Sequence, residues 1–260
     1  MTEVRTRVEN GVAVVELDNP PMNVVTLTLT RTLDGLLDEL AASDEVRALV
    51  ITGGGSRAFC AGSDIKEFAA LIGPEGQVLE RKLNLENAVY DKLAAFPKPT
   101  VAAINGHAMG GGLEMAVCCD LLVAAQTAKL GLPEIKLGVL PGSGGTFRVP
   151  RRIGVGRAKE MMLLGEPIDA ATALAWGLVN RVVPAAEVLA TALEIATRLA
   201  NLPGKALQAC KRAIDLPIVD DDVEIVRQTL QLSEQVFEGE DVQEGVRAFF
   251  AKEKPRFRHR

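Results

Sequence analysis

Two glutamates that could act as an acid and a base lie in similar apolar, glycine-rich surroundings. Glu114 follows the consecutive glycines 110–112, and Glu134 precedes a second glycine-dense stretch, 142–145. A carboxyl group buried among apolar residues has a raised pKa, which suits it to proton transfer. We therefore predict one site with two partly buried carboxylates. For Glu114 the alternative is a solvated residue in the first turn of a helix, where the helix dipole favours a carboxylate.

The glycines of segment 110–112 stand just before a predicted helix. Glycine lets a ligand approach the backbone closely and adopts conformations that are closed to other residues. The first N–H groups of a helix have no partner within the helix, so they favour negative charge. This arrangement would suit a developing oxyanion. The alternative is a glycine-rich turn that only allows a strand to pack tightly against a helix.

Segment 59–66, which reads FCAGSDIK, follows a predicted buried strand at 47–52. Ligands of α/β proteins tend to bind beyond the carboxyl ends of strands, so this segment is a candidate ligand-binding loop. The alternative is an ordinary connection between a strand and a helix in which Asp64 caps the helix.

The spacing of glycine, serine and histidine argues against several common sites. GHAMGG is not the dinucleotide fingerprint GxGxxG, no GxxxxGK phosphate loop occurs, and LPGSGG does not supply GxSxG. The chain has 2 histidines, His107 and His259, so we expect no histidine-ligated metal site. Nothing in the sequence pairs Ser63 with His107 as a hydrolase triad requires, and we expect His107 to be structural.

Strands and helices alternate through most of the chain, which predicts an α/β fold with crossover connections. The pair Asn10-Gly11 between two β-rich runs is a strong hairpin signal. Beyond about residue 184 the pattern is almost entirely helical. We therefore predict a core with the active site, 1–185, and a C-terminal helical region, 186–260, that packs on the core or on a neighbouring subunit. The expected strands are 4–8, 12–17, 47–52, 100–104 and 120–125, and the expected helices are 28–41, 76–95, 113–119, 187–200, 204–215, 221–238 and 241–252.

Composition narrows the class of protein further. Hydrophobic residues make up 48% and aromatic residues only 4%, so the core must be aliphatic and rich in alanine. A net charge of −5 argues against a nucleic-acid surface, which needs clustered basic charge. We expect no membrane span and no signal peptide. The cysteines show no CxxC spacing, so we expect them to be reduced and the protein to be cytoplasmic; they are Cys60, Cys118, Cys119 and Cys210.

Taken together, these segments resemble the enoyl-CoA hydratase/isomerase (crotonase) family. The likeness covers nearly the whole chain, through AFCAGSDIKEF, KPTVAAINGHAMGGGLEMAVCCD, LGLPEIKLGVLPGSGGTFRVPRRIG and EKPRF. The joint pattern is highly specific, whereas a single glycine cluster or glutamate would not be. The resemblance implies a spiral of ββα units, with C-terminal helices that mediate a trimer or a dimer of trimers. It also implies an acyl-CoA thioester as substrate, with no cofactor other than the coenzyme A of that substrate and no metal.

The same resemblance implies roles for individual residues. The backbone N–H groups of Ser63 and Gly111 match an oxyanion hole that polarises the thioester carbonyl. Glu114 would activate the attacking water, Glu134 would deliver a proton to the α-carbon, and Gly142 would lie close to that water. Hydratases frequently carry alanine where this chain has Ser63, which affects the expected acyl preference. The segment that matches the coenzyme A site comprises Ala61, Gly62, Ser63, Asp64, Ile65 and Lys66.

Two other kinds of function stay open. The first is another reaction on the same scaffold, by a double-bond isomerase or a carnitinyl-type hydroxyacyl-CoA dehydratase. Retention of both glutamates favours water chemistry, because isomerases of the family often keep only one. The second is a non-catalytic or RNA-binding protein, against which the net charge of −5 argues.

Overall fold

The protein is built on two β-sheets. The computed structural model describes residues 4–71 and 77–216, and near the C-terminus 240, 241, 244, 248, 251–253 and 255–258. Strands of the large sheet lie in the order β1-β2-β3-β5-β7-β10 and those of the small sheet in the order β4-β6-β8-β9. Among the strand pairs of the described residues, β1–β2 and β8–β9 are antiparallel and the others are parallel. The strands are β1 (Val4–Glu9), β2 (Val12–Leu17), β3 (Ala48–Gly53), β4 (Ala58–Cys60), β5 (Thr100–Ile104), β6 (His107–Met109), β7 (Leu121–Ala125), β8 (Lys129–Gly131), β9 (Ile168–Asp169) and β10 (Arg181–Val183).

A repeating unit runs through this arrangement. A strand of the large sheet leads to a strand of the small sheet and then to a helical segment, as in β3–β4–α2 (Ile65–Leu71) and β5–β6–α4 (Gly111–Ala116). The next repeat, β7–β8, leads to the 3₁₀ turn η2 (Glu134–Leu137) and to α5 (Gly145–Ile153). This confirms the predicted α/β spiral of ββα units.

The small sheet brings three of the segments predicted to form the site to the carboxyl ends of its parallel strands. Strands β4, β6 and β8 are parallel neighbours, so their carboxyl ends point the same way. Ser63, Gly111 and Glu134 each lie two or three residues beyond the end of one of these strands. The sequence predicted a loop around β4 and a glycine-dense stretch around β6, and it predicted no strand at β8. Each of these strands has only 3 residues, too few for a period-2 pattern to be recognised.

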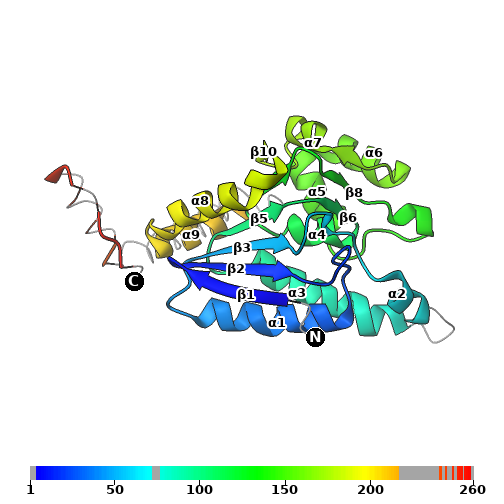
Figure 1. The fold of residues 1–260 in the computed structure, drawn as a ribbon, viewed down its shortest axis with the longest axis horizontal. Coiled ribbons are helices and arrows are strands. Elements are labelled where there is room, and N and C mark those ends of the chain that lie inside the picture. The colour runs from blue at the N-terminus through cyan, green and yellow to red at the C-terminus, as the bar shows by residue number, and fades with distance from the viewer. Residues whose placement is uncertain are drawn as a thin grey trace.

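Helices cover both faces of the large sheet (Figure 1). Helices α1 (Leu27–Ala42) and α3 (Asn84–Ala94) lie on one side, and α8 (Val188–Ala200) lies on the other, followed by α9 (Gly204–Ile214). Their bounds agree with the predicted helices, except that α3 is preceded by a π-helical turn, η1 (Leu79–Leu83). Thr26 caps α1 by accepting a hydrogen bond from Leu29 N–H. The remaining helices are α6 (Val155–Leu164) and α7 (Ala170–Trp176).

Two of the predicted helices lie wholly or mostly outside the described residues. The one at 221–238 lies outside the described residues, and the one at 241–252 lies mostly outside them. The domain boundary near 185 therefore stays a prediction. Within the described part of the chain, no helix is long and apolar enough to cross a membrane.

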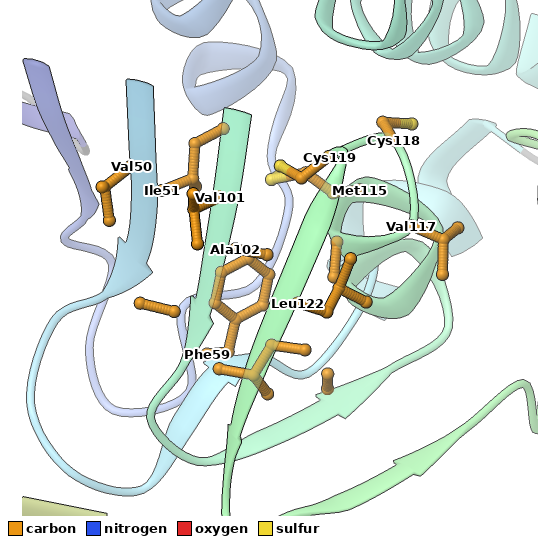
Figure 2. Packing of buried hydrophobic residues seen from close by; sticks show 14 of the residues in the cluster. Val50, Ile51, Phe59, Val101, Ala102, Met115, Val117, Cys118, Cys119 and Leu122 are labelled. Atoms are coloured by element: carbon orange, nitrogen blue, oxygen red, sulfur yellow. The ribbon is translucent and has the colours of Figure 1, made fainter. Parts of the chain in front are cut away.

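One hydrophobic core joins the two sheets to α1, α3, α4 and α8. Side chains of β3, β5 and β7 meet those of α4, and Phe59 of β4 projects among them (Figure 2). The core consists mainly of valine, leucine, isoleucine and alanine, as the composition predicted. The buried aromatic residues among those described are Phe59, Tyr90 and Phe96. All four cysteines are free, and only Cys210 is exposed.

Candidate active site

Two backbone N–H groups meet where the segments after β4 and β6 touch. Ser63 forms a β-bridge with Val25, in which Val25 N–H donates to Gly62 O (2.8 Å) and Asp64 N–H donates to Val25 O (2.9 Å). Because this bridge uses the groups on either side of Ser63, the N–H of Ser63 itself points away from Val25. The Ser63 nitrogen lies beside Gly111, where a Cβ atom would be 3.7 Å from it.

Gly111 supplies the second N–H group. It is the first residue of α4, so its N–H has no carbonyl partner one turn earlier in that helix. A Cβ atom on Gly62 would lie 3.5 Å from Gly111 N, which shows how closely the two segments approach. The structure therefore places the two N–H groups that were predicted to form an oxyanion hole close to each other.

Glu114 is held by two other backbone N–H groups. Its side chain is only 3% exposed, so the predicted burial is confirmed and the solvated alternative is wrong. Its Oε1 atom accepts hydrogen bonds from Ser143 N–H and Gly145 N–H, both at 2.8 Å. Burial raises the pKa of Glu114 to about 7, against the lowering effect of the Gly145 hydrogen bond, and the charge of Glu134 contributes to the rise. A carboxyl group with this pKa can take up and release a proton near neutral pH.

Glu134 lies against the glycines that precede α4. A Cβ atom on Gly110 would come within 2.9 Å of its Oε1 atom. Its Oε2 atom is buried and has no hydrogen-bond partner among the described residues. Burial raises the pKa of Glu134 above the usual value. An unpartnered buried oxygen of this kind favours the protonated carboxyl, which can donate a proton.

In the segment expected to bind coenzyme A, some residues make contacts within the protein and others are exposed. Ala61 and Gly62 hold the loop by backbone hydrogen bonds to Met22 and Val25. Asp64 Oδ1 accepts hydrogen bonds from the N–H groups of Lys66 and Glu67, so Asp64 does cap α2, as its alternative interpretation proposed. The side chains of Ile65 and Lys66 are exposed. No contact in the described chain tests their expected role toward coenzyme A.

Gly142 makes a different contact from Ser143 and Gly145, which lie in the same loop. Its carbonyl accepts a hydrogen bond from Asn87 Nδ2 at 2.8 Å, whereas Ser143 and Gly145 provide the N–H groups that reach Glu114. The sequence marks this loop as glycine-dense, but its pattern does not single out Ser143 or Gly145. Their selection would have required knowing where the loop passes Glu114.

A set of buried polar residues on and just before α3 was missed. Lys82, Glu86 and Tyr90 are each at most 1% exposed. Tyr90 O–H donates to Gly111 O at 2.9 Å, and Lys82 and Glu86 form an ion pair at 3.1 Å. The only signal in the sequence is the four-residue spacing of a lysine and a glutamate. That spacing is more typical of a solvated helix face.

Comparison with known proteins defines the class. The chain belongs to the enoyl-CoA hydratase/isomerase family, whose model matches residues 7–260, and it is an enzyme with the crotonase-type fold. A probable enoyl-CoA hydratase from Bacillus subtilis is 38% identical to it over 99% of both chains. A short-chain-enoyl-CoA hydratase from Clostridium acetobutylicum is 36% identical, over 95% of this chain and 94% of that relative.

A solved structure shows the same likeness in three dimensions. The crystal structure of an enoyl-CoA hydratase from Bacillus anthracis superposes with a TM-score of 0.94 at 35% sequence identity. The superposition covers 99% of this chain and 100% of the other.

Proposed function

We propose that this enzyme is an enoyl-CoA hydratase, which adds water reversibly to a 2-enoyl-CoA thioester to give a 3-hydroxyacyl-CoA. The observation that carries the proposal is a pair of carboxyls at the glycine-rich start of α4. Glu114 is buried within α4, and Glu134 is half-buried and rests against Gly110, next to the Gly111 N–H donor. The names of the relatives at 36–38% identity support the same activity.

In the proposed reaction, the N–H groups of Ser63 and Gly111 bind the thioester oxygen. When water adds to the β-carbon, electrons move onto this oxygen and an enolate forms. Fixed donors that point at an oxygen gaining charge stabilise the transition state more than the ground state. This arrangement makes the β-carbon a better acceptor for the water oxygen.

The two carboxyls would move the protons. Glu114, as carboxylate, removes a proton from water as its oxygen bonds to the β-carbon, and Glu134, as the neutral acid, protonates the α-carbon. Burial raises the pKa of Glu114 to about 7, so it can be ionised near neutral pH, where the hydrogen bonds from Ser143 and Gly145 stabilise its charge. Glu134 Oε2 has no such donor among the described residues, and burial raises the pKa of Glu134 as well. Because no electrons leave the substrate, the reaction needs no cofactor beyond the coenzyme A carried by the thioester. The reverse steps give dehydration.

The proposal extends to the partners and the location. Large apolar side chains are exposed on α6 and α7, which supports a homotrimer or a dimer of trimers that covers them. They are Val155, Leu163, Leu164 and Leu174. The four free cysteines agree with the reducing cytoplasm.

The test is turnover of crotonyl-CoA and of a panel of longer and branched enoyl-CoA thioesters. Hydration should remove the absorbance of the conjugated enoyl thioester and increase the product mass by one water. A double-bond isomerase would instead give a product of unchanged mass. Absence of turnover on every enoyl-CoA and 3-hydroxyacyl-CoA thioester would refute the proposal.

A further inference from the structure

One helix face beside the proposed active site carries three buried polar side chains. Lys82, in η1, and Glu86 and Tyr90, in α3, follow each other at intervals of four residues, so they lie along one side of this helical stretch. Lys82 and Glu86 are each 1% exposed. Removing two charges from water costs free energy, and this cost can exceed the attraction between them, so a buried ion pair does not by itself stabilise the fold. The other contacts of Lys82 and Glu86 therefore indicate their role.

The contacts of Glu86 join two loops that are far apart in the sequence. Ser63 O–H donates to Glu86 Oε1 at 3.2 Å, and Ser143 O–H donates to Glu86 Oε2 at 2.9 Å. The backbone N–H of Ser63 is one of the proposed oxyanion donors. The backbone N–H of Ser143 donates to Glu114. One carboxylate therefore holds the side chains of two residues whose backbones face the reacting atoms.

Lys82 completes this link. Its Nζ atom lies 3.1 Å from Glu86 Oε1 and also donates to Val25 O at 3.2 Å. The lysine thus neutralises Glu86. It also ties the ion pair to Val25, the residue that forms the β-bridge with Ser63.

We propose that Glu86, paired with Lys82, is a positioning residue that fixes the Ser63 N–H donor relative to the Glu114 carboxylate. The inference rests on the proposed hydratase function for its kinetic readout. A misplacement of about 1 Å in such a constellation can cost about 10²-fold in rate, so a link between the two loops affects the chemical step directly.

Two double variants test the link. Lys82→Met/Glu86→Gln removes both charges but keeps an amide that can accept from one serine and donate to the other. Lys82→Met/Glu86→Leu removes both charges and the link. We expect the leucine variant to lose about 10- to 100-fold in kcat with KM changed less than about 3-fold, and the glutamine variant to keep most of the wild-type kcat. Using double variants avoids leaving either buried charge of the pair unpaired. Glu67, whose Oε2 atom lies 3.5 Å from Lys82 Nζ, is 33% exposed and stays hydrated when the lysine is removed.

A matched control removes another partly buried ion pair, Lys211–Asp120 (3.0 Å), which lies outside the site. Lys211→Met/Asp120→Asn should retain wild-type kcat, which would show that loss of a partly buried ion pair outside the site does not by itself slow the reaction. Equal kcat in the glutamine and leucine variants, whether high or low, would overturn the proposal.

Crystal structures of the two double variants give a readout that needs no activity. The distance between Ser63 and Ser143 should be preserved with glutamine at position 86 and changed with leucine. An unchanged distance in the leucine variant would overturn the proposal even if the wild-type enzyme hydrates no enoyl-CoA. Failure of the proposed function is therefore separable from failure of the positioning role.

Discussion

The carboxylate of Glu134 rests against the backbone of Gly110, so closely that a Cβ atom there would lie 2.9 Å from Glu134 Oε1. Gly110 also has a φ of 52°, in the region that favours glycine. Gly110→Ala should therefore displace Glu134 and lower kcat by about 10²-fold or more. The control is Gly35→Ala in α1, where a Cβ atom meets nothing within 4 Å. Wild-type kcat in a folded Gly110→Ala variant would contradict the prediction.

Replacing either carboxyl should remove proton transfer and leave the fold intact. Glu114→Gln and Glu134→Gln should each lower kcat by about 10²- to 10⁴-fold, the usual contribution of a general acid or base. Glu194→Gln on the exposed side of α8 is the control and should retain activity. Near-wild-type hydration by either site variant would exclude that residue from the mechanism.

Glu114 should also make stability depend on pH. Its folded pKa of about 7 exceeds the ordinary value of 4.5. The folded state thus binds the proton more tightly, and the contribution of this group to stability is lost as pH rises from about 4.5 to 7. Glu114→Gln should therefore raise the free energy of unfolding at pH 8 by up to about 3 kcal/mol, and by much less at pH 5. Urea unfolding at both pH values measures this, and a larger gain at pH 5 would contradict the assignment.

Two substitutions at Ser63 separate its backbone from its hydroxyl. Ser63→Ala keeps the N–H and loses only one contact of the Glu86 link, because Lys82 still joins Glu86 to Val25, so kcat should fall by about 10-fold or less. Ser63→Pro deletes the N–H, and loss of one oxyanion donor costs about 10²–10³ in kcat. The bridge to Val25 does not use this N–H, so the proline removes no hydrogen bond of the bridge. Circular dichroism controls for folding. Equal inactivity of both variants would assign the role to the hydroxyl.

Lys66 offers a test of coenzyme A binding. Its side chain is exposed at the start of α2, where its charge can attract phosphate oxygens. Lys66→Ala should raise KM for enoyl-CoA more than for the truncated pantetheine thioester, whereas Lys205→Ala on α9 should change neither. An equal rise in KM for both substrates would show that Lys66 does not contact the nucleotide end.

Local patterns in the sequence predicted the parts of the site that depend on local chemistry. Apolar neighbours and adjacent glycines were enough to predict the burial of Glu114, and Asn10-Gly11 marked the hairpin. The contacts of Ser143 and Glu86 could not be predicted in this way, because each depends on the approach of segments distant in the sequence. Lys82 and Glu86 also have the spacing of an exposed helical pair, so periodicity alone would have placed them in solvent.

The parallel course of β4, β6 and β8 divides the chemistry among successive repeats. The repeats β3–β4–α2 and β5–β6–α4 carry the N–H groups that would stabilise the enolate, and the second of them also carries Glu114. The repeat that contains β8 carries Glu134. Substitutions after β8 could therefore redirect the proton while leaving enolate formation intact. A scaffold organised in this way can acquire a new reaction on the same thioester and still bind the carbonyl oxygen.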